Sequence, residues 1–231
     1  MKKTQKIKVI GAGGIGSHLI DPLARYSSYT DDHVEITVID GDAFEERNRE
    51  RQKFNSCGNK AEHTVEMMKE SFPQVHFRAK GEYVTDSNVI TTIRENDVVF
   101  LCVDNHATRK LVSERCSELD NVTLISGGND ETDGDVLIYI RKNGKDVTPP
   151  LTSLPEIANI ADDSKNPGDL TEEERQGCER EAQTKPQILF MNLDIASLML
   201  NCYYAHEQGK LKSHRVFTDI LTQARRSVKG E

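Results

Sequence analysis

Short apolar runs alternate with longer amphipathic segments over the first half of the chain. The apolar runs have the length of buried strands, and we expect strands over residues 6–10, 34–39, 75–79, 97–103 and 122–126. The segments between them carry helical spacing and helix-end residues, and we expect helices over residues 15–26, 59–71, 86–95 and 107–119. This alternation predicts an α/β fold in which a mostly parallel sheet carries helices on both faces.

The pattern changes in the second half. Residues 135–141 predict one more strand, and we expect at least one strand after residue 133 to be antiparallel. Residues 142–185 are proline-rich, acidic and without periodicity, which predicts a long, mobile crossover loop. The remainder, residues 186–231, is expected to hold an apolar helix over 187–205 and a basic tail with no clear pattern.

Composition and charge argue against several classes of protein. The length suits a single domain over residues 1–231, and the net charge of −8 argues against nucleic acid or an anionic membrane as partner. The stretch richest in apolar residues, 188–204, is interrupted by Asn192, Asp194 and Asn201, so it predicts a buried helix rather than a membrane span. The five cysteines include no CxxC pair, which argues against a disulfide framework or a four-cysteine zinc site and favours a cytoplasmic setting.

A glycine-rich segment, GAGGIG at residues 11–16, lies between an expected strand and an expected helix. Glycines in this pattern let the backbone approach a phosphate group, which then faces the amides at the N-terminus of a helix. Asp40 ends the second expected strand, where a carboxylate can accept hydrogen bonds from ribose hydroxyls. The two features predict a Rossmann-like nucleotide-binding fold and leave NAD and ATP open, with an NAD-dependent reductase as the ordinary interpretation.

The polar residues that follow are unusual for a dinucleotide enzyme. They are Asp42, Asn48, Arg51, Gln52 and Lys60. An enzyme that bends ATP for attack on its α-phosphate uses such groups, because an arginine holds phosphate oxygens bidentately and a lysine neutralises charge as a point cation. Each residue taken singly is more typical of a solvated charged loop, so the spacing of the whole set carries the argument for a nucleotide site.

Five motifs in this order and spacing resemble those of the ThiF/MoeB family, the bacterial relatives of ubiquitin-activating enzymes. They are GAGGIG at 11–16, DGD at 40–42, NRERQ at 48–52, the lysine of GNKAEH at residue 60, and DNHATR at 104–109. The resemblance is strong over residues 6–141 and weaker over the helix expected at 187–205.

The resemblance implies an adenylyltransferase that uses ATP and Mg²⁺. Its substrate would be the C-terminal carboxylate of a small ubiquitin-like or sulfur-carrier protein ending in glycine, and pyrophosphate would be released. Arg51, Lys60 and Asp104 would act in catalysis, with Asp104 binding Mg²⁺ directly or through water. Residues of all five motifs would contact the nucleotide: Gly11, Gly13, Gly14, Gly16, Asp40, Asp42, Asn48, Arg51, Gln52, Lys60, Asp104 and Asn105.

Cys178 lies in the expected crossover loop, where this family can place a cysteine that takes the activated acyl group as a thioester. Arg175 and Arg180 favour its thiolate while neighbouring glutamates oppose it, so a thioester and an ordinary exposed thiol both stay open. Three other cysteines fall in expected strands and helices and are interpreted as core residues: Cys102, Cys116 and Cys202.

The resemblance also implies a homodimer, because family members pair through this domain. The helix expected at 187–205 is apolar on nearly every side, more than one core face needs, and its surplus face is expected to form the interface.

Two other functions stay open at this point. An NAD(P)-dependent oxidoreductase needs a group for hydride transfer, and the chain after residue 141 offers no obvious one. A non-catalytic member that binds a partner protein has no need of Asp40, Arg51, Lys60 and Asp104, all of which are present.

Overall fold

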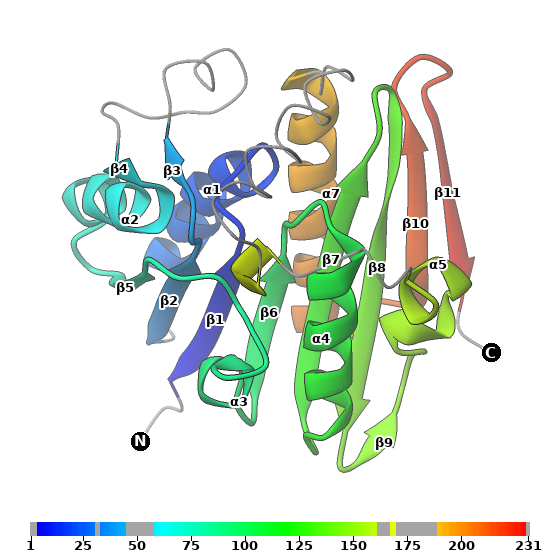
Figure 1. The fold of residues 1–231 in the computed structure, drawn as a ribbon. Coiled ribbons are helices and arrows are strands. Elements are labelled where there is room, and N and C mark those ends of the chain that lie inside the picture. Colours follow the sequence, from blue (N-terminus) through cyan, green and yellow to red (C-terminus); the bar gives the residue numbers. More distant parts are fainter. Residues whose placement is uncertain (1–3, 31–32, 45–57, 161–166, 170–188, 230–231) are drawn as a thin grey trace.

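A mixed β-sheet forms the middle layer of the molecule, and helices cover both of its faces (Figure 1). The computed structural model describes residues 4–30, 33–44, 58–160, 167–169 and 189–229. The sheet consists of β1 (Gln5–Ile10), β2 (Val34–Ile39), β5 (His76–Lys80), β6 (Asp97–Leu101), β7 (Val122–Asn129), β8 (Asp133–Lys142), β9 (Lys145–Asp146), β10 (Ser213–Asp219) and β11 (Ala224–Lys229). A small separate pair consists of β3 (Ala43–Phe44) and β4 (Gly58–Asn59). The helical elements are α1 (Gly16–Tyr29), α2 (Lys60–Ser71), α3 (Val89–Thr92), α4 (His106–Ser117), η2 (Leu151–Ser153), α5 (Pro155–Ala158), η3 (Pro167–Asp169) and α7 (Leu189–Glu207).

The order of strands across the sheet is β11-β10-β8-β7-β6-β1-β2-β5, and β9 pairs with β8. Strands β5, β2, β1, β6 and β7 are parallel, whereas β8, β10 and β11 are antiparallel to their neighbours. This confirms the α/β prediction and the antiparallel strand after residue 133. Strand β1 lies between β2 and β6, so the carboxyl ends of these three strands form the switch in strand order where such sheets bind ligands.

Two apolar layers hold the helices against the sheet. The first lies between the sheet and α1, α2 and α7, with Val9 and Met199 among its fully buried members. The second lies on the opposite face, under α3, α4 and α5, with Leu101 and Val112 fully buried. Each aliphatic side chain buried in this way contributes roughly 1.5–3 kcal/mol, so these layers fix where the strand ends meet.

The helix predicted over residues 86–95 is much shorter in the structure. Helix α3 has four residues, and Asn88 rather than Asp86 or Ser87 precedes it. The Asn88 side chain accepts a hydrogen bond from the Thr85 amide (2.9 Å) and donates one to the Tyr83 carbonyl (2.8 Å). Those bonds fix the loop before α3.

The crossover segment is partly ordered. Its first part, residues 142–160, contains β9, η2 and α5, and Leu151 and Ile157 are buried beneath α4. The expectation of an irregular segment was wrong there, because a proline at the first position of α5 starts a helix and the apolar residues complete the second core layer. Residues 161–166 and 170–185 lie outside the described residues, and the mobility of the loop stays a prediction.

Helix α7 confirms the apolar helix expected near the C-terminus. A Cβ atom on Gly127 of β7 would lie 2.4 Å from the Met199 sulfur, so the glycine is what allows the helix to pack this closely on the sheet. Phe190, Leu193 and Tyr204 are 69%, 42% and 54% exposed and form the surplus apolar side of α7. In the described part of the chain, no helix combines the length and hydropathy needed to cross a membrane.

The basic tail is also ordered. Its residues form the β10–β11 hairpin, which extends the antiparallel part of the sheet. The tail carried no alternating pattern strong enough to predict these strands, since β11 is exposed along most of its length and buries no apolar face.

Candidate functional site

The glycine loop connects β1 to α1, and two of its glycines are required for steric reasons. Gly11 has φ +93°, a conformation that favours glycine, and a Cβ atom there would lie 2.7 Å from the Cys102 carbonyl oxygen. A Cβ atom on Gly16 would lie 2.0 Å from the Gly11 carbonyl oxygen. Gly13 and Gly14 are half-buried at the N-terminus of α1, where helix amides and the helix dipole attract a phosphate group.

Asp40 ties the end of β2 to the glycine loop. Its two carboxylate oxygens accept hydrogen bonds from the amides of Ala12 (2.6 Å) and Asp42 (2.8 Å). Burial raises the pKa of Asp40, while the Lys60 ammonium and the two amides act against that shift. Each carboxylate oxygen has a second lone pair, so the group can still accept a hydrogen bond from a ligand.

Lys60, the first residue of α2, pairs with a second acidic residue, Asp42, which lies two positions after Asp40. Its ammonium lies 2.9 Å from an Asp42 carboxylate oxygen, and its side chain is only 10% exposed. Asn59 fixes the start of the helix, because its oxygen accepts from the Glu62 amide (3.1 Å) and its amide nitrogen donates to the Asp40 carbonyl (2.9 Å). The motif residues of β2 and α2 therefore form one cluster.

Tyr83 joins this cluster from the loop after β5. Its hydroxyl donates a hydrogen bond to the second Asp42 carboxylate oxygen. A Cβ atom on Gly41 would lie 2.4 Å from the tyrosine ring, so the ring packs directly against the backbone of the DGD motif. No motif in the sequence pointed to Tyr83, whereas Asn59 carried a signal as an asparagine, a common N-cap residue, at the start of an expected helix.

Asp104 follows β6 at the same edge of the sheet and is exposed. The next residue, Asn105, caps α4 by accepting a hydrogen bond from the Thr108 amide (2.8 Å), and its predicted contact with a nucleotide stays a prediction. Arg109 is buried one turn further along α4, and its guanidinium donates to the carbonyls of Val103 (3.0 Å) and Gly127 (3.1 Å). The arginine therefore holds the segment that presents Asp104.

A magnesium ion bound here would have few protein ligands. The described residues contain no group of three or more His, Cys, Asp or Glu side chains placed to hold a metal. Mg²⁺ in nucleotide enzymes takes one or two carboxylates and completes its shell with phosphate oxygens and water. A single exposed carboxylate such as Asp104 fits that mode of binding.

Four predicted site residues lie outside the described residues: Asn48, Arg51, Gln52 and Cys178. The cysteines expected in the core are confirmed as free and buried: Cys102, Cys116 and Cys202. Burial raises the pKa of the Cys102 thiol to about 12 and that of Cys202 to about 11, so neither forms a thiolate near neutral pH.

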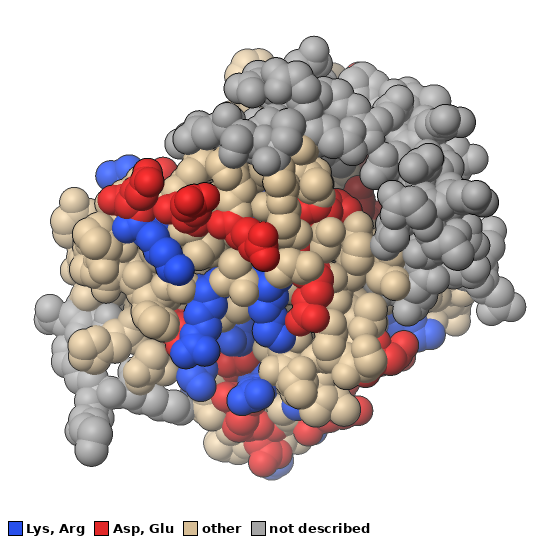
Figure 2. All heavy atoms as spheres, turned by 60° about the vertical axis from the view of Figure 1, so that its left-hand side comes forward, with Lys and Arg blue, Asp and Glu red and all other residues tan. Residues whose placement is uncertain are grey.

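The side of the molecule with β5 as its edge strand presents mixed charge (Figure 2). Lys and Arg side chains gather near the middle of this view, with acidic side chains around them. Arg78 of β5 pairs with Glu35 (3.1 Å), and Lys80 pairs with Glu82 (3.2 Å). These pairs keep the surface from being uniformly positive.

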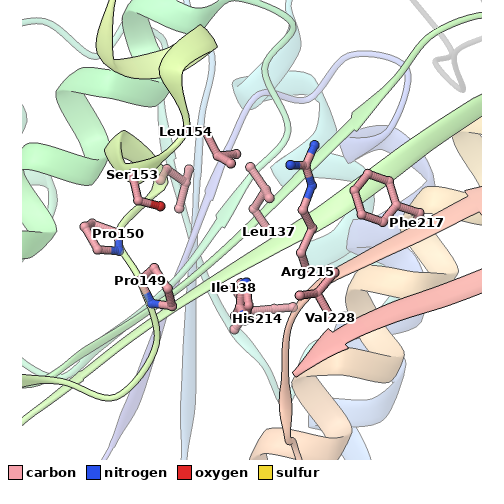
Figure 3. A pocket seen from close by; sticks show the side chains of 11 residues that line it. Leu137, Ile138, Pro149, Pro150, Ser153, Leu154, His214, Arg215, Phe217 and Val228 are labelled. Atoms are coloured by element: carbon pink, nitrogen blue, oxygen red, sulfur yellow. The ribbon is translucent and has the colours of Figure 1, made fainter. Parts of the chain in front are cut away.

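A separate hollow lies on the antiparallel part of the sheet (Figure 3). It has about 520 Å³ of empty space, part of it open to solvent, and its walls are mainly apolar, with Pro149, Pro150 and Leu154 facing Phe217 and Val228. None of the predicted nucleotide-binding residues lines it. The cluster of Asp40, Asp42 and Lys60 and this hollow are therefore distinct places on the molecule.

The parallel strand order, the glycine loop and the buried acid after β2 define a nucleotide-binding domain of the Rossmann type. The sequence matches the ThiF family over residues 2–231, and the chain belongs to that family. The resemblance seen in the motifs is thus confirmed.

Curated relatives with similar sequences carry names that combine two activities. The chain is 32% identical over 146 residues to "Adenylyltransferase and sulfurtransferase MOCS3" of Drosophila ananassae, covering 62% of this chain and 31% of that protein. It is 30% identical over 146 residues to "Adenylyltransferase and sulfurtransferase UBA4" of Yarrowia lipolytica, covering 62% of this chain and 35% of that protein. The chain thus spans about a third of the length of these relatives.

Solved structures share the fold at low sequence identity. The structure of E. coli MccB with MccA-N7isoASN matches with a TM-score of 0.72 at 18% identity, over 97% of this chain and 64% of that one. PaaA matches with a TM-score of 0.70 at 16% identity, over 97% of this chain and 64% of that one.

Proposed function

We propose that this chain catalyses the ATP-dependent adenylation of a C-terminal carboxylate. The observation that carries the proposal is the meeting of three strand ends: the glycine loop after β1, Asp40 with Lys60 beside β2, and Asp104 after β6. Membership of the ThiF family and the word adenylyltransferase in the names of two relatives support it.

Each residue of the cluster has a role that its geometry permits. The amides of the glycine loop bind phosphate oxygens, and the remaining lone pairs of the Asp40 carboxylate accept a hydrogen bond from a ribose hydroxyl. Lys60 supplies a positive charge beside the phosphates, and we assign the same task to Asn48, Arg51 and Gln52 on the strength of the motif.

The reaction transfers the adenylyl group of ATP to a carboxylate oxygen of the substrate. A carboxylate oxygen of the substrate attacks the α-phosphorus, and the bond from that phosphorus to the oxygen bridging to the β-phosphate breaks. The bonding electron pair leaves with pyrophosphate, and the product is an acyl adenylate. The Lys60 ammonium stabilises the negative charge that develops on the phosphate oxygens. A Mg²⁺ ion held by Asp104 would supply further neutralisation of this charge.

The substrate we propose is a small ubiquitin-like or sulfur-carrier protein that ends in glycine. Where Cys178 takes the acyl group, its thiolate attacks the acyl carbon and AMP leaves, which gives a thioester. We further propose a homodimer that uses the exposed apolar side of α7. The full activity of the longer relatives is not assigned to this chain, which matches only about a third of their length.

ATP–pyrophosphate exchange in the presence of a candidate carrier protein tests the proposal. Wild-type protein is expected to exchange, Asp104→Ala to lose exchange while keeping its fold, and Asp40→Ala to show weaker ATP binding. Asp120→Ala is a matched control, because Asp120 is exposed directly before β7, at the amino ends of the parallel strands and away from the site. Exchange at the wild-type rate by Asp104→Ala would contradict the role of Asp104, and NAD binding without exchange would favour an oxidoreductase.

A non-reducing gel tests the transfer to sulfur. Cys178→Ala is expected to keep the adenylation half-reaction and to lose any adduct that a reducing agent removes. An adduct that survives the substitution would place the nucleophile elsewhere, and the absence of an adduct in wild type would mean that the enzyme stops at the adenylate.

A further inference from the structure

Tyr83 contacts the nucleotide-binding cluster although it belongs to none of the motifs. It lies in the loop after β5, 41 residues beyond Asp42 in the sequence. The Asn88 side chain holds this loop at Tyr83 and two residues beyond it, through the Tyr83 carbonyl and the Thr85 amide. The next residue, Val84, is 3% exposed and anchors the loop in the core. The position of the tyrosine is therefore set by the fold.

The ring of Tyr83 explains the glycine between the two aspartates. The nearest ring carbons would lie 2.4–2.6 Å from a Cβ atom at position 41, so any other side chain there would displace the tyrosine. Gly41 does not adopt a positive φ, which means that space rather than backbone conformation requires a glycine. The Tyr83 ring therefore occupies the space that a side chain at position 41 would need.

The hydroxyl of Tyr83 reaches Lys60 through Asp42. The Asp42 carboxylate accepts the tyrosine hydrogen bond on one oxygen and pairs with the Lys60 ammonium (2.9 Å) on the other. The Asp42 backbone is fixed as well, since its amide donates to Asp40 and its carbonyl accepts from the Lys60 amide (2.8 Å). The Asp42 side chain is 43% exposed, and the hydrogen bond from Tyr83 and the ion pair with Lys60 both act on its orientation.

We propose that Tyr83 is a positioning residue for the phosphates of the nucleotide, acting on Lys60 through Asp42. A lysine side chain has four rotatable bonds, and an ion pair to a fixed carboxylate places its charge at one point. Removal of the tyrosine hydroxyl lets the Asp42 carboxylate turn, and the ammonium turns with it. The inference rests on the proposed function, because it assigns Lys60 to the phosphates.

The test compares ATP with adenosine as ligands in Tyr83→Phe. This substitution keeps the ring against Gly41 and removes only the hydroxyl. The dissociation constant for ATP is expected to rise roughly three- to tenfold, which corresponds to part of one charge-assisted hydrogen bond. The dissociation constant for adenosine is expected to stay unchanged, because adenosine has no phosphate for Lys60 to contact.

Tyr139→Phe is the matched control. The Tyr139 hydroxyl also donates to a carboxylate, that of Asp146 (2.7 Å), but on the β8–β9 side of the molecule. The control is expected to bind both ligands as wild type does, even where its thermal midpoint falls. It thus separates the loss of a buried tyrosine hydroxyl from the loss of this particular one.

A double-mutant cycle with Lys60→Met tests whether the effect passes through the lysine. The double variant is expected to bind ATP no more weakly than Lys60→Met alone, because the residue that Tyr83 positions is absent. If Lys60→Met does not fold, the difference between ATP and adenosine in Tyr83→Phe decides alone.

Three results overturn the role of Tyr83 and leave the nucleotide site intact. They are an equal weakening of ATP and adenosine binding, an unchanged dissociation constant for ATP, and additive effects in the double variant. A wild-type protein that binds neither ligand overturns the nucleotide site and this role together, so the two failures can be told apart.

Discussion

Replacement of Arg109 by methionine removes a buried guanidinium from the segment that carries Asp104. The guanidinium donates to the Val103 and Gly127 carbonyls and so connects the segment after β6 to β7. A hydrogen bond from a charged donor contributes about 1.5–3 kcal/mol, and part of that is offset because burial of the guanidinium is itself unfavourable. Burial lowers the pKa of Arg109, which reflects this cost.

The expected loss for Arg109→Met is about 2–3 kcal/mol in the free energy of unfolding. For a chain of this length that corresponds to a fall of roughly 4–12 °C in the thermal midpoint. Thermal unfolding followed by circular dichroism measures this loss. ATP–pyrophosphate exchange, measured well below the midpoint, is expected to fall at least about tenfold, because a shift of about 1 Å in a positioned group costs that much or more.

Arg115→Met provides the matched control on the same helix. Its guanidinium donates to the Ile93 carbonyl (3.1 Å) and pairs with Glu118 (2.9 Å), away from Asp104. It is expected to lower the midpoint without changing exchange in the folded protein. An Arg109→Met protein that melts within about 2 °C of wild type would show that the desolvation cost cancels the hydrogen bonds. Unchanged exchange in the same variant would show that Asp104 does not depend on Arg109.

Three further outcomes follow from the structure. Gly16→Ala forces a Cβ atom against the Gly11 carbonyl, so ATP binding measured by calorimetry is expected to be lost and the thermal midpoint to fall; retained binding would contradict the described loop. Burial lowers the pKa of His206, which contacts Thr123, so the stability that the neutral imidazole contributes is present above the unfolded pKa near 6.5 and is lost as the pH falls through the lower folded pKa. Urea titrations are expected to show that the free energy of unfolding falls less between about pH 7.5 and pH 5 in His206→Gln than in wild type, and an equal fall would refute this assignment. Leu193→Glu places a charge on the exposed apolar side of α7 and is expected to convert a dimer into a monomer in light scattering, whereas a dimer that persists would place the interface elsewhere.

The local parts of the site could be predicted from the sequence. A glycine pattern directly after an apolar run indicated the β1–α1 loop, and Asp40 and Asp104 each follow an apolar run that became a strand. Parallel strands place their carboxyl ends at one edge, so the motifs alone brought these residues to the same side of the sheet.

Other features had no pattern from which they could be predicted. Strand β11 is exposed along most of its length, and α5 begins in a proline-rich stretch that resembled a loop. Such elements form because a neighbouring strand or core layer is already in place, and no periodicity within the segment records that neighbour.

The amino-acid sequence by itself determined which backbone segments form the nucleotide loop and which acids follow the strands, because steric limits on glycine and the burial of apolar runs act over a few residues. Only the tertiary structure decided what holds those acids in place. Tyr83 reaches Asp42 across 41 residues, and Arg109 reaches the Gly127 carbonyl across 18. Hydrogen bonds of this kind depend on how two core layers stack the strands and helices, and that arrangement is set by packing over the whole domain.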